Sequence, residues 1–327
     1  MGGVQRSSSI SLIRLIALVF IINCHKMQWL NLELAWWFNV GVQIFLCISG
    51  YLYGQKDVGE LTSFYSRRFK KILIPYFIVF ISYGLLQFFF AKDVFVASSF
   101  LKGLLVNASL KGAGHLWFVA TILMCYVLTP LLEAYRNRYV KNRKSWIVLT
   151  LLAVEITVVF FGLFDKFFNP VWISFYVIGY ALGINEKQKH INTKVLTSLI
   201  GVVALIGNAI QIYCSYVIHK DFPEYQCFCD FNHVMLGVFL FLALMILCDK
   251  LQLGKGMNGL LRFTDKYSYE MYLVHHLIIL GPFSLMALMG VNAVNIVIIL
   301  VMTVLLAMML KYISEILQKV MFKKGLV

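Results

Sequence analysis

The sequence predicts an all-α membrane protein, a bundle of about ten transmembrane helices. Of its 327 residues 61% are apolar and only 13% are charged, and the mean hydropathy is +0.81. Average soluble domains are about 45–50% apolar and about 25% charged, whereas ten spans of about 20 residues would take up this apolar share. The composition therefore excludes a water-soluble globular domain and a disordered chain.

Ten apolar runs mark the expected spans. Each is long enough to cross a hydrocarbon core of roughly 30 Å as a helix, and none shows the alternating pattern of a β-barrel strand. In chain order, we expect helices at residues 10–30, 34–54, 72–91, 115–134, 146–164, 168–185, 195–218, 231–249, 267–289 and 291–315. The first run continues without a small-residue cleavage site, so it is interpreted as a span and not as a signal peptide.

Basic residues between the runs justify these boundaries and predict the orientation. The connections expected on the cytoplasmic side hold, in chain order, Arg6, Lys56, Arg67, Arg68, Lys70, Lys71, Arg136, Arg138, Lys141, Arg143, Lys144, Lys187, Lys189, Lys194, Lys250, Lys255, Arg262, Lys266, Lys319, Lys323 and Lys324. The opposite connections hold Lys26, Lys92, Lys102, Lys111, Lys166 and Lys220. Because cytoplasmic loops are enriched in Lys and Arg, this bias predicts an even number of spans and both termini in the cytoplasm.

The net charge of +14 is therefore interpreted as an orientation signal, and no nucleic-acid partner is expected. None of the connections is long enough for a second folded domain, so residues 1–327 are expected to form a single transmembrane domain without a separate soluble domain. The pair Gly179-x-x-x-Gly183 is a small-residue motif that predicts close helix packing. The seven Cys residues indicate neither a metal site nor a redox role.

The first expected span carries two ionisable side chains on one face. Arg14 and His25 are eleven residues apart, which at about 100° per residue places them within about 20° of each other and about 16 Å apart along the helix. Ionisable groups inside a bilayer cost about 2.5–3.5 kcal/mol each on insertion scales, so they are candidates for function. The alternative is that Arg14 snorkels to the inner headgroups and His25 to the outer ones.

A second polar stripe is expected in the span over residues 267–289. Ser268, Tyr272 and His275 are spaced by four and three residues and share one helix face. Counted from the start of that span, His275 lies about 12 Å into the membrane, at a depth between those of Arg14 and His25. The alternative is a neutral histidine that is hydrogen-bonded within the bundle.

Other polar residues occur near these stripes. Glu270 is expected at about the depth of Arg14 and is interpreted as the acidic partner in a structural ion pair, whereas His276 points about 100° away from the stripe and is given no role. At the outer surface, His115 and Trp117 open the fourth span, and most of the tryptophans map to outer ends. This one-sided distribution favours a platform for an extracytoplasmic ligand such as a sugar over a plain aromatic belt.

A basic cluster immediately precedes the third span. It consists of Arg67, Arg68, Lys70 and Lys71. Such a cluster acts as an orientation signal, contacts anionic lipid or binds a ligand that bears phosphate groups, and the sequence leaves these alternatives open.

Five short motifs occur in register along nearly the whole chain. The first is Arg14, ten residues and His25, and the others are Gly41-Val42-Gln43-Ile44-Phe45-Leu46-Cys47-Ile48-Ser49-Gly50-Tyr51, Ile74-Pro75-Tyr76 after the basic cluster, His115-Leu116-Trp117-Phe118 with Leu128-Thr129-Pro130-Leu131-Leu132, and Tyr267-Ser268-Tyr269 with Tyr272-Leu273-Val274-His275. Together they resemble the membrane-bound acyltransferase family 3, which O-acylates bacterial cell-surface glycans. The second motif departs from the family pattern at Leu46, where Phe is usual, and at Gln43, where an acidic residue is common.

The resemblance implies an acyltransferase that moves an acyl group, most often acetyl, from cytoplasmic acyl-CoA to a hydroxyl of a cell-surface or lipid-linked glycan. His25 is the expected catalytic residue, as a base or as a transient acyl carrier, and Arg14 is expected to orient the donor or to stabilise charge near its thioester. The other expected site residues are Arg67, Arg68, Lys70 and Lys71 for the CoA phosphates, Ser268, Tyr272, His275 and Glu270 in support, and His115 and Trp117 on the acceptor side.

Acyl-CoA enters this scheme as a co-substrate, so neither a permanently bound cofactor nor a metal is expected. Many larger family members add a C-terminal esterase-like domain, and this chain is expected to be the minimal form without it. The expected location is the cell's inner (cytoplasmic) membrane, as a multi-pass protein. The lipid bilayer, a hydroxyl acceptor, further copies of the chain and polysaccharide-synthesis proteins are its expected partners.

Two other classes of function fit parts of the pattern. A proton-coupled transporter or glycan flippase would use His25, His275 and Glu270 as a proton relay. Transporters often show inverted repeats with paired broken helices, and the sequence shows neither, which favours the enzyme. A structural partner of a polysaccharide synthase is the third alternative.

Overall fold

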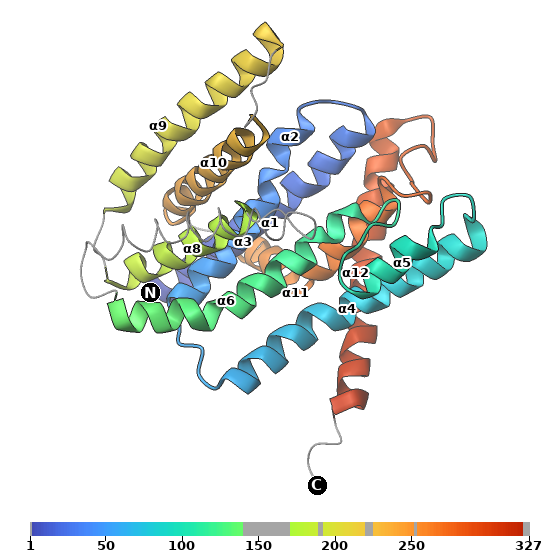
Figure 1. The fold of residues 1–327 in the computed structure, drawn as a ribbon, viewed down its shortest axis with the longest axis horizontal. Coiled ribbons are helices and arrows are strands. Elements are labelled where there is room, and N and C mark those ends of the chain that lie inside the picture. The colour runs from blue at the N-terminus through green and yellow to red at the C-terminus, as the bar shows by residue number, and fades with distance from the viewer. Residues whose placement is uncertain (1, 140–170, 189–191, 220–224, 252–253, 323–327) are drawn as a thin grey trace. The chain divides into compact units, whose positions relative to one another are not determined.

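The computed structural model describes residues 2–139, 171–188, 192–219, 225–251 and 254–322 (Figure 1). All regular structure in these ranges is helical, and they contain no β-strand. The expected all-α class is confirmed.

The helices follow one another along the chain as Figure 1 labels them. They are α1 (Gly2–Trp29), α2 (Ala35–Phe38), α3 (Val40–Gly54), α4 (Leu61–Phe90), α5 (Ala97–Leu104), the 3-10 turn η1 (Gly114–Leu116), α6 (Trp117–Tyr139), α8 (Val171–Gln188), α9 (Thr193–Ile212), the π-helical turn η2 (Tyr213–Ile218), α10 (Tyr225–Cys248), α11 (Lys255–His275), the 3-10 turn η3 (His276–Ile278) and α12 (Asn292–Phe322).

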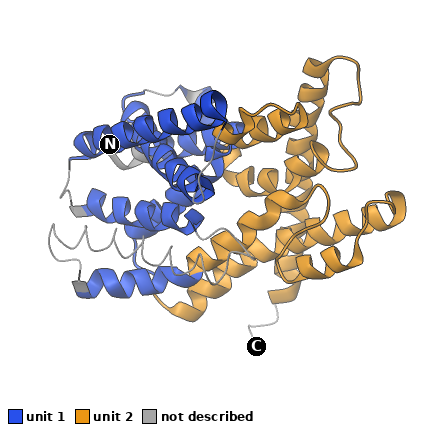
Figure 2. Cartoon of the chain, turned by 45° about the horizontal axis from the view of Figure 1, so that its top comes forward, with its two compact units in different colours: residues 1–20, 39–58, 127–261 blue, residues 21–38, 59–126, 262–327 orange. Residues whose placement is uncertain are grey.

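The chain divides into two compact units, which Figure 2 shows in different colours. Unit 1 consists of residues 1–20, 39–58 and 127–261, and unit 2 consists of residues 21–38, 59–126 and 262–327. The chain passes from one unit to the other within α1, α6 and α11, and also in the connections before and after α3.

Within the described ranges, seven helices are long and apolar enough to cross a membrane. They are Ser8–Trp29, Ala35–Gly54, Leu61–Phe90, Gly114–Arg138, Thr193–Ile218, Tyr225–Cys248 and Asn292–Phe322. These helices match the expected first, second, third, fourth, seventh, eighth and tenth spans, so the protein is a multi-pass membrane protein. The helix α8 lies where the sixth span was expected but is not among these seven, and the fifth, 146–164, lies outside the described residues. The total of about ten and the cytoplasmic termini stay predictions.

The helix α4 starts earlier than expected, at Leu61 instead of residue 72. Its first turns are too polar to be recognised by an apolar run, and the hydroxyls of Thr62 and Ser63 both donate to the carboxylate of Glu60, the residue before the helix. The basic cluster therefore lies on a helix and not in a loop.

The expected ninth span, 267–289, is wrong in its extent. The helix α11 begins at Lys255 and ends at His275, and only the short turn η3 follows it before residues 279–291, which contain no α-helix. The pair Gly281-Pro282 explains the break, because proline lacks the N–H that a helix interior needs and glycine weakens a helix. Hydropathy alone does not reveal this break because the run stays apolar on both sides of it.

Unit 1 is built around the closely packed helices α3 and α8. A Cβ atom at Gly50 would lie 2.0 Å from the carbonyl oxygen of Tyr176, and one at Gly179 would lie 2.2 Å from the carbonyl oxygen of Cys47. No side chain fits at either position, so the two backbones lie in contact. The packing role predicted for Gly179 and Gly183 is confirmed, and Gly50 is the counterpart of these residues on α3.

Three amide side chains join α9 to α10 in unit 1, and we call them the amide ladder. Asn232 Nδ2 donates to Gln211 Oε1 at 2.7 Å, and Asn208 Nδ2 donates to Asn232 Oδ1 at 3.2 Å. Asn208 Nδ2 also donates to the carbonyl oxygen of Ala204. The polar groups of the ladder thus bond to one another between two apolar helices, a common way to hold membrane helices together.

An ion pair fastens the connection between α3 and α4 to the end of α6. Arg136 Nη2 lies 2.6 Å from Asp57 Oδ1 and 3.3 Å from Glu133 Oε1, and the backbone N–H of Val58 donates to Glu133. The Arg136 guanidinium, through its hydrogen bond and its charge, lowers the pKa of the Asp57 carboxyl below its usual value. Because Asp57 is exposed, solvent screening keeps this contact weak.

In unit 2, α4 packs against α5 and α12. Tyr76 donates to the carbonyl oxygen of Gly103 at 2.6 Å, and the rings of Phe80 and Phe100 stack with centroids 5.5 Å apart. At the start of α4, the Lys70 ammonium lies 3.5 Å from the ring centroid of Phe322 at the end of α12. The start of α4 and the end of α12 therefore lie at the same end of unit 2. The predicted topology places both on the cytoplasmic side.

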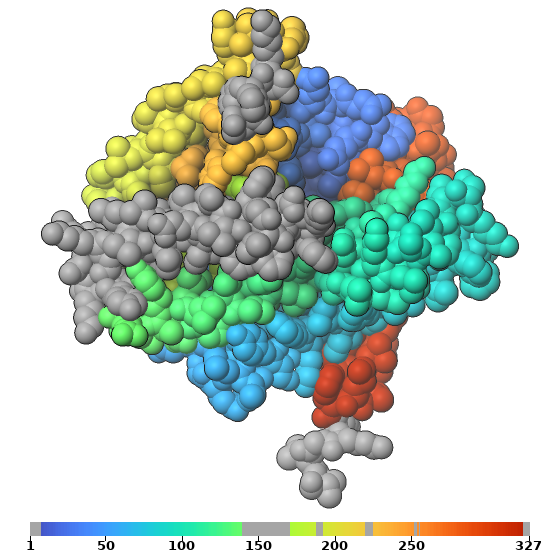
Figure 3. Space-filling model, viewed as in Figure 1, coloured from blue at the N-terminus to red at the C-terminus, as the bar shows by residue number. Residues whose placement is uncertain are grey.

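Apolar side chains cover large exposed faces of α9 and α12. Leu205 on α9 and Val301 on α12 are 72% and 52% exposed. Figure 3 shows α9 (yellow) and the end of α12 (red) at the surface of the molecule. Contiguous exposed apolar faces of this kind are unfavourable in water and suit contact with lipid tails.

Candidate active site

Four histidines lie close together in unit 2, and we call them the histidine cluster. His25 lies near the end of α1, His115 in η1, His275 at the end of α11 and His276 in η3. The four residues are 8%, 4%, 0% and 8% exposed, in that order. The six distances between their ring centroids run from 4.3 Å to 6.4 Å. Residues 250 positions apart in the sequence thus form one buried group of imidazoles.

His25 is oriented by a side chain of its own helix. Its Nδ1 donates to Oε1 of Gln28 at 2.6 Å, one helical turn further along α1. In a neutral imidazole, one nitrogen carries the proton and the other carries a lone pair. Because Nδ1 holds the proton here, Nε2 of His25 carries the lone pair and can accept a proton. The ring of His276 lies 4.3 Å from that of His25, and the ring of His275 lies 5.2 Å from it.

Main-chain carbonyl groups orient the other three rings. His115 Nε2 donates to Leu273 at 3.1 Å, and His276 Nδ1 donates to Gly112 at 2.7 Å. His275 Nδ1 donates to the carbonyl oxygen of Tyr272 at 2.8 Å. Each neutral ring thus uses its N–H to bond the protein and keeps its other nitrogen as an acceptor.

Two of these acceptor nitrogens are buried without a hydrogen bond in the described part of the chain. They are Nδ1 of His115 and Nε2 of His275. Leaving a buried acceptor unsatisfied costs about 1–3 kcal/mol, so such groups are uncommon unless a ligand or water satisfies them. The cluster therefore offers lone pairs to a group that brings O–H or N–H donors.

The backbone around Gly112 is fixed by tight packing, and this fixes the acceptor of His276. Gly112 has a φ of +81°, and a Cβ atom added there would lie 2.3 Å from the Tyr83 hydroxyl and 2.4 Å from Cα of Gly281. Tyr83 and Gln87 of α4 both donate to the carbonyl oxygen of the preceding Lys111. Only glycine meets both requirements at position 112, the left-handed backbone and the lack of space.

Tyr272 connects α11 to the turn that carries His115. Its hydroxyl donates to the carbonyl oxygen of His115, and its ring centroid lies 5.5 Å from that of His115 and 5.0 Å from that of Phe118. Tyr272, Ser268 and His275 are all buried, and they lie on α11 at the predicted helical spacing. The structure thus brings Tyr272 and His275, two members of the expected stripe, close to His25 and His115.

Two of the expected positions differ in the structure. His275 was placed between the depths of Arg14 and His25, but its ring lies beside that of His25 because α11 starts at Lys255 and not at residue 267. His115 was placed at the outer surface, but it is buried in the cluster.

Glu270 forms an ion pair, as expected, and its partner is Lys311 of α12. The Lys311 ammonium lies 3.0 Å from Glu270 Oε1, and Glu270 is 3% exposed. A carboxylate buried to this degree needs a cation nearby, because an unpaired charge in such a place is costly. The pair links α11 to α12.

Arg14 and the basic cluster lie on other parts of the fold. Arg14 is partly buried on α1, which is continuous from Gly2 to Trp29 and so keeps the predicted spacing to His25. On α4, Arg67 and Lys71 are exposed, whereas Arg68 and Lys70 are partly buried. The roles predicted for these residues stay predictions.

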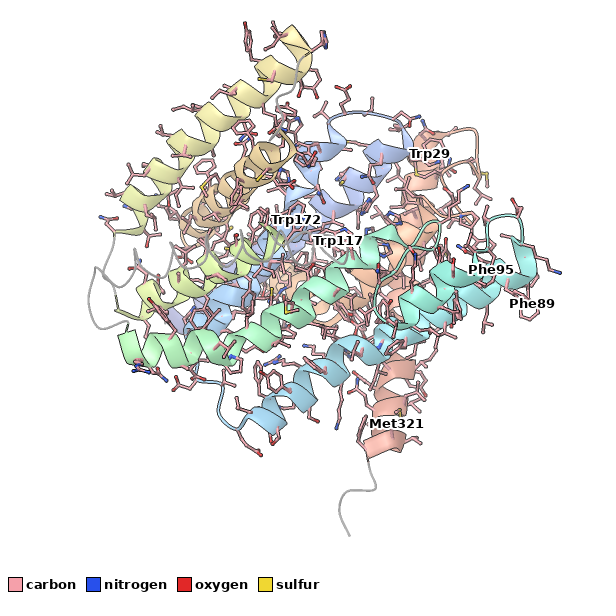
Figure 4. All side chains as sticks on the ribbon, viewed as in Figure 1. Trp29, Phe89, Phe95, Trp117, Trp172 and Met321 are labelled. Atoms are coloured by element: carbon pink, nitrogen blue, oxygen red, sulfur yellow. The ribbon has the colours of Figure 1, made fainter. Side chains whose placement is uncertain are left out.

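Trp117 begins α6, two positions after His115, and Figure 4 labels it together with Trp29 at the end of α1. The Trp117 side chain is partly buried, and its ring centroid lies 6.3 Å from that of Phe118. Its predicted position on the acceptor side stays a prediction.

Among the described residues, no group of three or more His, Cys, Asp and Glu side chains has the arrangement that a metal ion needs. The near-parallel rings of His115 and His276, which stack at 4.4 Å with an interplanar angle of 16°, illustrate the difficulty. Stacked rings do not direct their in-plane lone pairs toward one common point.

Sequence reasoning missed two members of this site. His276 was expected to point away from the stripe because the helix was expected to continue past it. Instead, α11 ends at His275, and the turn η3 directs the His276 ring toward His25. Gln28 gave no signal because a glutamine near the end of a span is ordinary. Its spacing of three residues from His25, which lets a side chain reach back along one helix turn, was the available clue.

Comparison with known proteins identifies the family. The family model described as "Acyltransferase domain" matches residues 7–312, nearly the whole chain. No curated protein and no solved structure matches the chain at a significant level. The family match covers α1 with Arg14 and His25, the turn that carries His115 and the end of α11 with His275 and His276. The chain therefore belongs to the acyltransferase family 3 and is a membrane acyltransferase.

Proposed function

We propose that the protein transfers an acyl group, in the first instance acetyl, from cytoplasmic acyl-CoA to a hydroxyl of a cell-surface or lipid-linked glycan. The observation that supports this proposal best is the histidine cluster around His25 in a chain of this family. Its buried acceptor nitrogens suit an incoming hydroxyl, which brings the donor hydrogen that the cluster lacks.

In this proposal His25 acts as the general base. Nε2 of His25 removes the proton of the acceptor hydroxyl while its oxygen attacks the thioester carbon, which forms the new C–O bond. The C–S bond then breaks, and the CoA thiolate takes the proton from the His25 imidazolium. Atoms and charges balance without a further co-reactant. Because a thioester is already activated, a neutral imidazole is a sufficient base and no metal is required.

The donor contacts in this proposal come from arginine and lysine side chains. The CoA phosphates would bind the basic cluster, where an arginine fork can hold one phosphate through two hydrogen bonds and a lysine acts as a point charge. Arg14, about 16 Å from His25 along α1, would orient the donor near its thioester.

The acceptor would approach from the opposite side of the membrane. The predicted topology places the end of α1 and the start of α6 on the extracytoplasmic side, so the glycan would approach past Trp117 toward the buried His115. We place the protein in the inner membrane, with polysaccharide-synthesis proteins or further copies of the chain as partners.

Labelled acetyl-CoA tests this proposal on the purified protein in nanodiscs. We expect transfer of the label to a glycan extract, and a loss of at least about 100-fold in His25→Ala, because general-base catalysis contributes about 10²–10⁴-fold. Arg14→Ala should weaken donor binding as well as turnover. The matched control is His219→Asn, a histidine outside the cluster at a left-handed backbone position that asparagine tolerates.

Three outcomes would contradict the proposal. Transfer that persists unchanged in His25→Ala would exclude His25 as the base. Donor binding that persists unchanged in Arg14→Ala would exclude Arg14 from the donor site. Substrate movement that requires a proton gradient but no acyl-CoA would favour the transporter or flippase.

A further inference from the structure

The side chain that holds His25 is Gln28. The bond between His25 Nδ1 and Gln28 Oε1 measures 2.6 Å, which is short for an N–H donor and an amide acceptor. Three residues separate the two side chains on α1, so a single helical turn brings them together. The described neighbours of His25 across from this bond are His115, His275 and His276, none of which accepts a hydrogen bond from Nδ1.

We propose that Gln28 is a positioning residue, which holds the His25 ring with its proton on Nδ1 and its lone pair on Nε2. The inference rests on the proposed role of His25 as the base. Which ring nitrogen of a histidine carries the proton is set by the hydrogen bond that the other nitrogen makes. An unconstrained imidazole favours the tautomer with its proton on Nε2, in which the nitrogen that should act as the base is blocked.

The chemistry of an amide partner differs from that of a carboxylate. In serine proteases an aspartate holds the catalytic histidine and also stabilises the imidazolium that forms. Gln28 supplies the orientation without the negative charge, and its carbonyl oxygen is an acceptor at every pH of interest. The His25 imidazolium formed during transfer is therefore short of a counter-charge and gives its proton readily to the departing thiolate.

Gln28 is a suitable position for substitution because it is exposed, whereas the His25 ring that it contacts is buried. His25 is 8% exposed, whereas Gln28 is exposed at the end of α1. Substitutions at an exposed helix position usually change stability by less than about 0.5 kcal/mol, so they leave the fold intact and isolate the effect on the ring.

The opposing interpretation is a local surface contact with no effect on catalysis. Three substitutions separate the two interpretations. Gln28→Met keeps the length and removes the acceptor, Gln28→Asn keeps the amide and shortens the reach, and Gln28→Glu keeps the acceptor and adds a charge. Lys26→Gln, a change two positions away on α1, controls for general effects on this helix end.

With labelled acetyl-CoA and a glycan acceptor, we expect kcat to fall about tenfold in Gln28→Met and Gln28→Asn, the scale of one lost hydrogen bond, while KM stays unchanged. Gln28→Glu should keep most of the activity but move the midpoint of the pH–activity profile upward, because a carboxylate stabilises the imidazolium. The other titratable groups that face His25 are His115, His275 and His276, with Tyr272 behind His115, and these are the same in every variant. Lys26→Gln should match the wild type.

The ring itself provides a readout that does not depend on turnover. In protein labelled with ¹⁵N-histidine, nitrogen chemical shifts distinguish the two tautomers, and the His25→Gln variant assigns the His25 signals. We expect Nδ1–H in the wild type and a mixture in Gln28→Met. A His25 ring that keeps its proton on Nδ1 in Gln28→Met would overturn the inference, and so would a changed tautomer with an unchanged kcat. Undiminished turnover in His25→Ala would instead contradict the proposed function, which the tautomer measurement does not test.

Discussion

Two groups of buried polar side chains, one in each unit, differ in how completely they are hydrogen-bonded. In unit 1, the amide ladder between α9 and α10 pairs donors with acceptors among its own members, with Asn232 donating to Gln211 and accepting from Asn208. In unit 2, the histidine cluster uses its N–H groups on the surrounding protein and leaves two acceptor nitrogens buried without hydrogen bonds, on His115 and His275. A polar cluster whose hydrogen bonds are all made holds the helices of an apolar bundle together. A cluster with unpaired acceptors can instead bind a ligand that donates hydrogen bonds.

The largest effect that this comparison predicts is on activity in unit 2. His275→Leu removes the unpartnered acceptor Nε2 together with the hydrogen bond from Nδ1 to the carbonyl oxygen of Tyr272, so we expect the thermal unfolding temperature to change little. Acetyl transfer should fall by about 100-fold or more, because the ring beside His25 is lost. Unfolding is followed by tryptophan fluorescence in nanodiscs and transfer with labelled acetyl-CoA. A drop in stability that matches the drop in activity would show that the cluster is structural.

The opposite pattern is expected in unit 1. Asn232→Leu leaves the buried Gln211 amide and the partly buried Asn208 amide with fewer partners, which should destabilise the protein by about 1–3 kcal/mol. The activity per folded molecule should stay close to that of the wild type. Unfolding curves and acetyl transfer, measured on the same preparation, decide this prediction. A selective loss of activity without a loss of stability would give the amide ladder a part in the chemistry.

The smallest effect is expected at the exposed Asp57–Arg136 pair. The pKa of Asp57 is lowered in the folded protein, so its charge stabilises the fold above the ordinary carboxyl pKa, and this contribution is lost as the pH falls through the lowered pKa. Asp57→Asn should therefore be slightly less stable than the wild type at neutral pH and equally stable in acid once the pH lies below the lowered pKa of Asp57, where both side chains are neutral. A stability difference that persists unchanged in acid would exclude this charge as its cause.

Much of the fold could be predicted from the sequence because a bilayer imposes a simple rule. A helix that crosses it must be apolar over about 20 residues, and the seven candidate spans in the described ranges follow the predicted runs. The rule gives wrong helix boundaries where apolar character and helical structure do not coincide. The polar first turns of α4 are helical without being apolar, and residues 279–289 are apolar without forming an α-helix.

The site was predictable to the extent that it lies on continuous helices. The shared face of Arg14 and His25 and the stripe from Ser268 to His275 are consequences of helix geometry alone. His276 was beyond this reasoning because its direction depends on where α11 ends. The meeting of His25, His115 and His275 depends on contacts between segments far apart in the sequence, which helical spacing does not encode.

The length of α12 has a consequence for the membrane around the protein. Its 31 residues rise about 46 Å, well beyond a hydrocarbon core of roughly 30 Å. Such a rod must lean over or extend past the headgroups, and the contact between Phe322 and Lys70 ties its far end to α4, which is nearly as long. Hydrophobic mismatch thus acts on both helices together, so the thickness of the surrounding lipid influences how steeply this pair stands in the membrane.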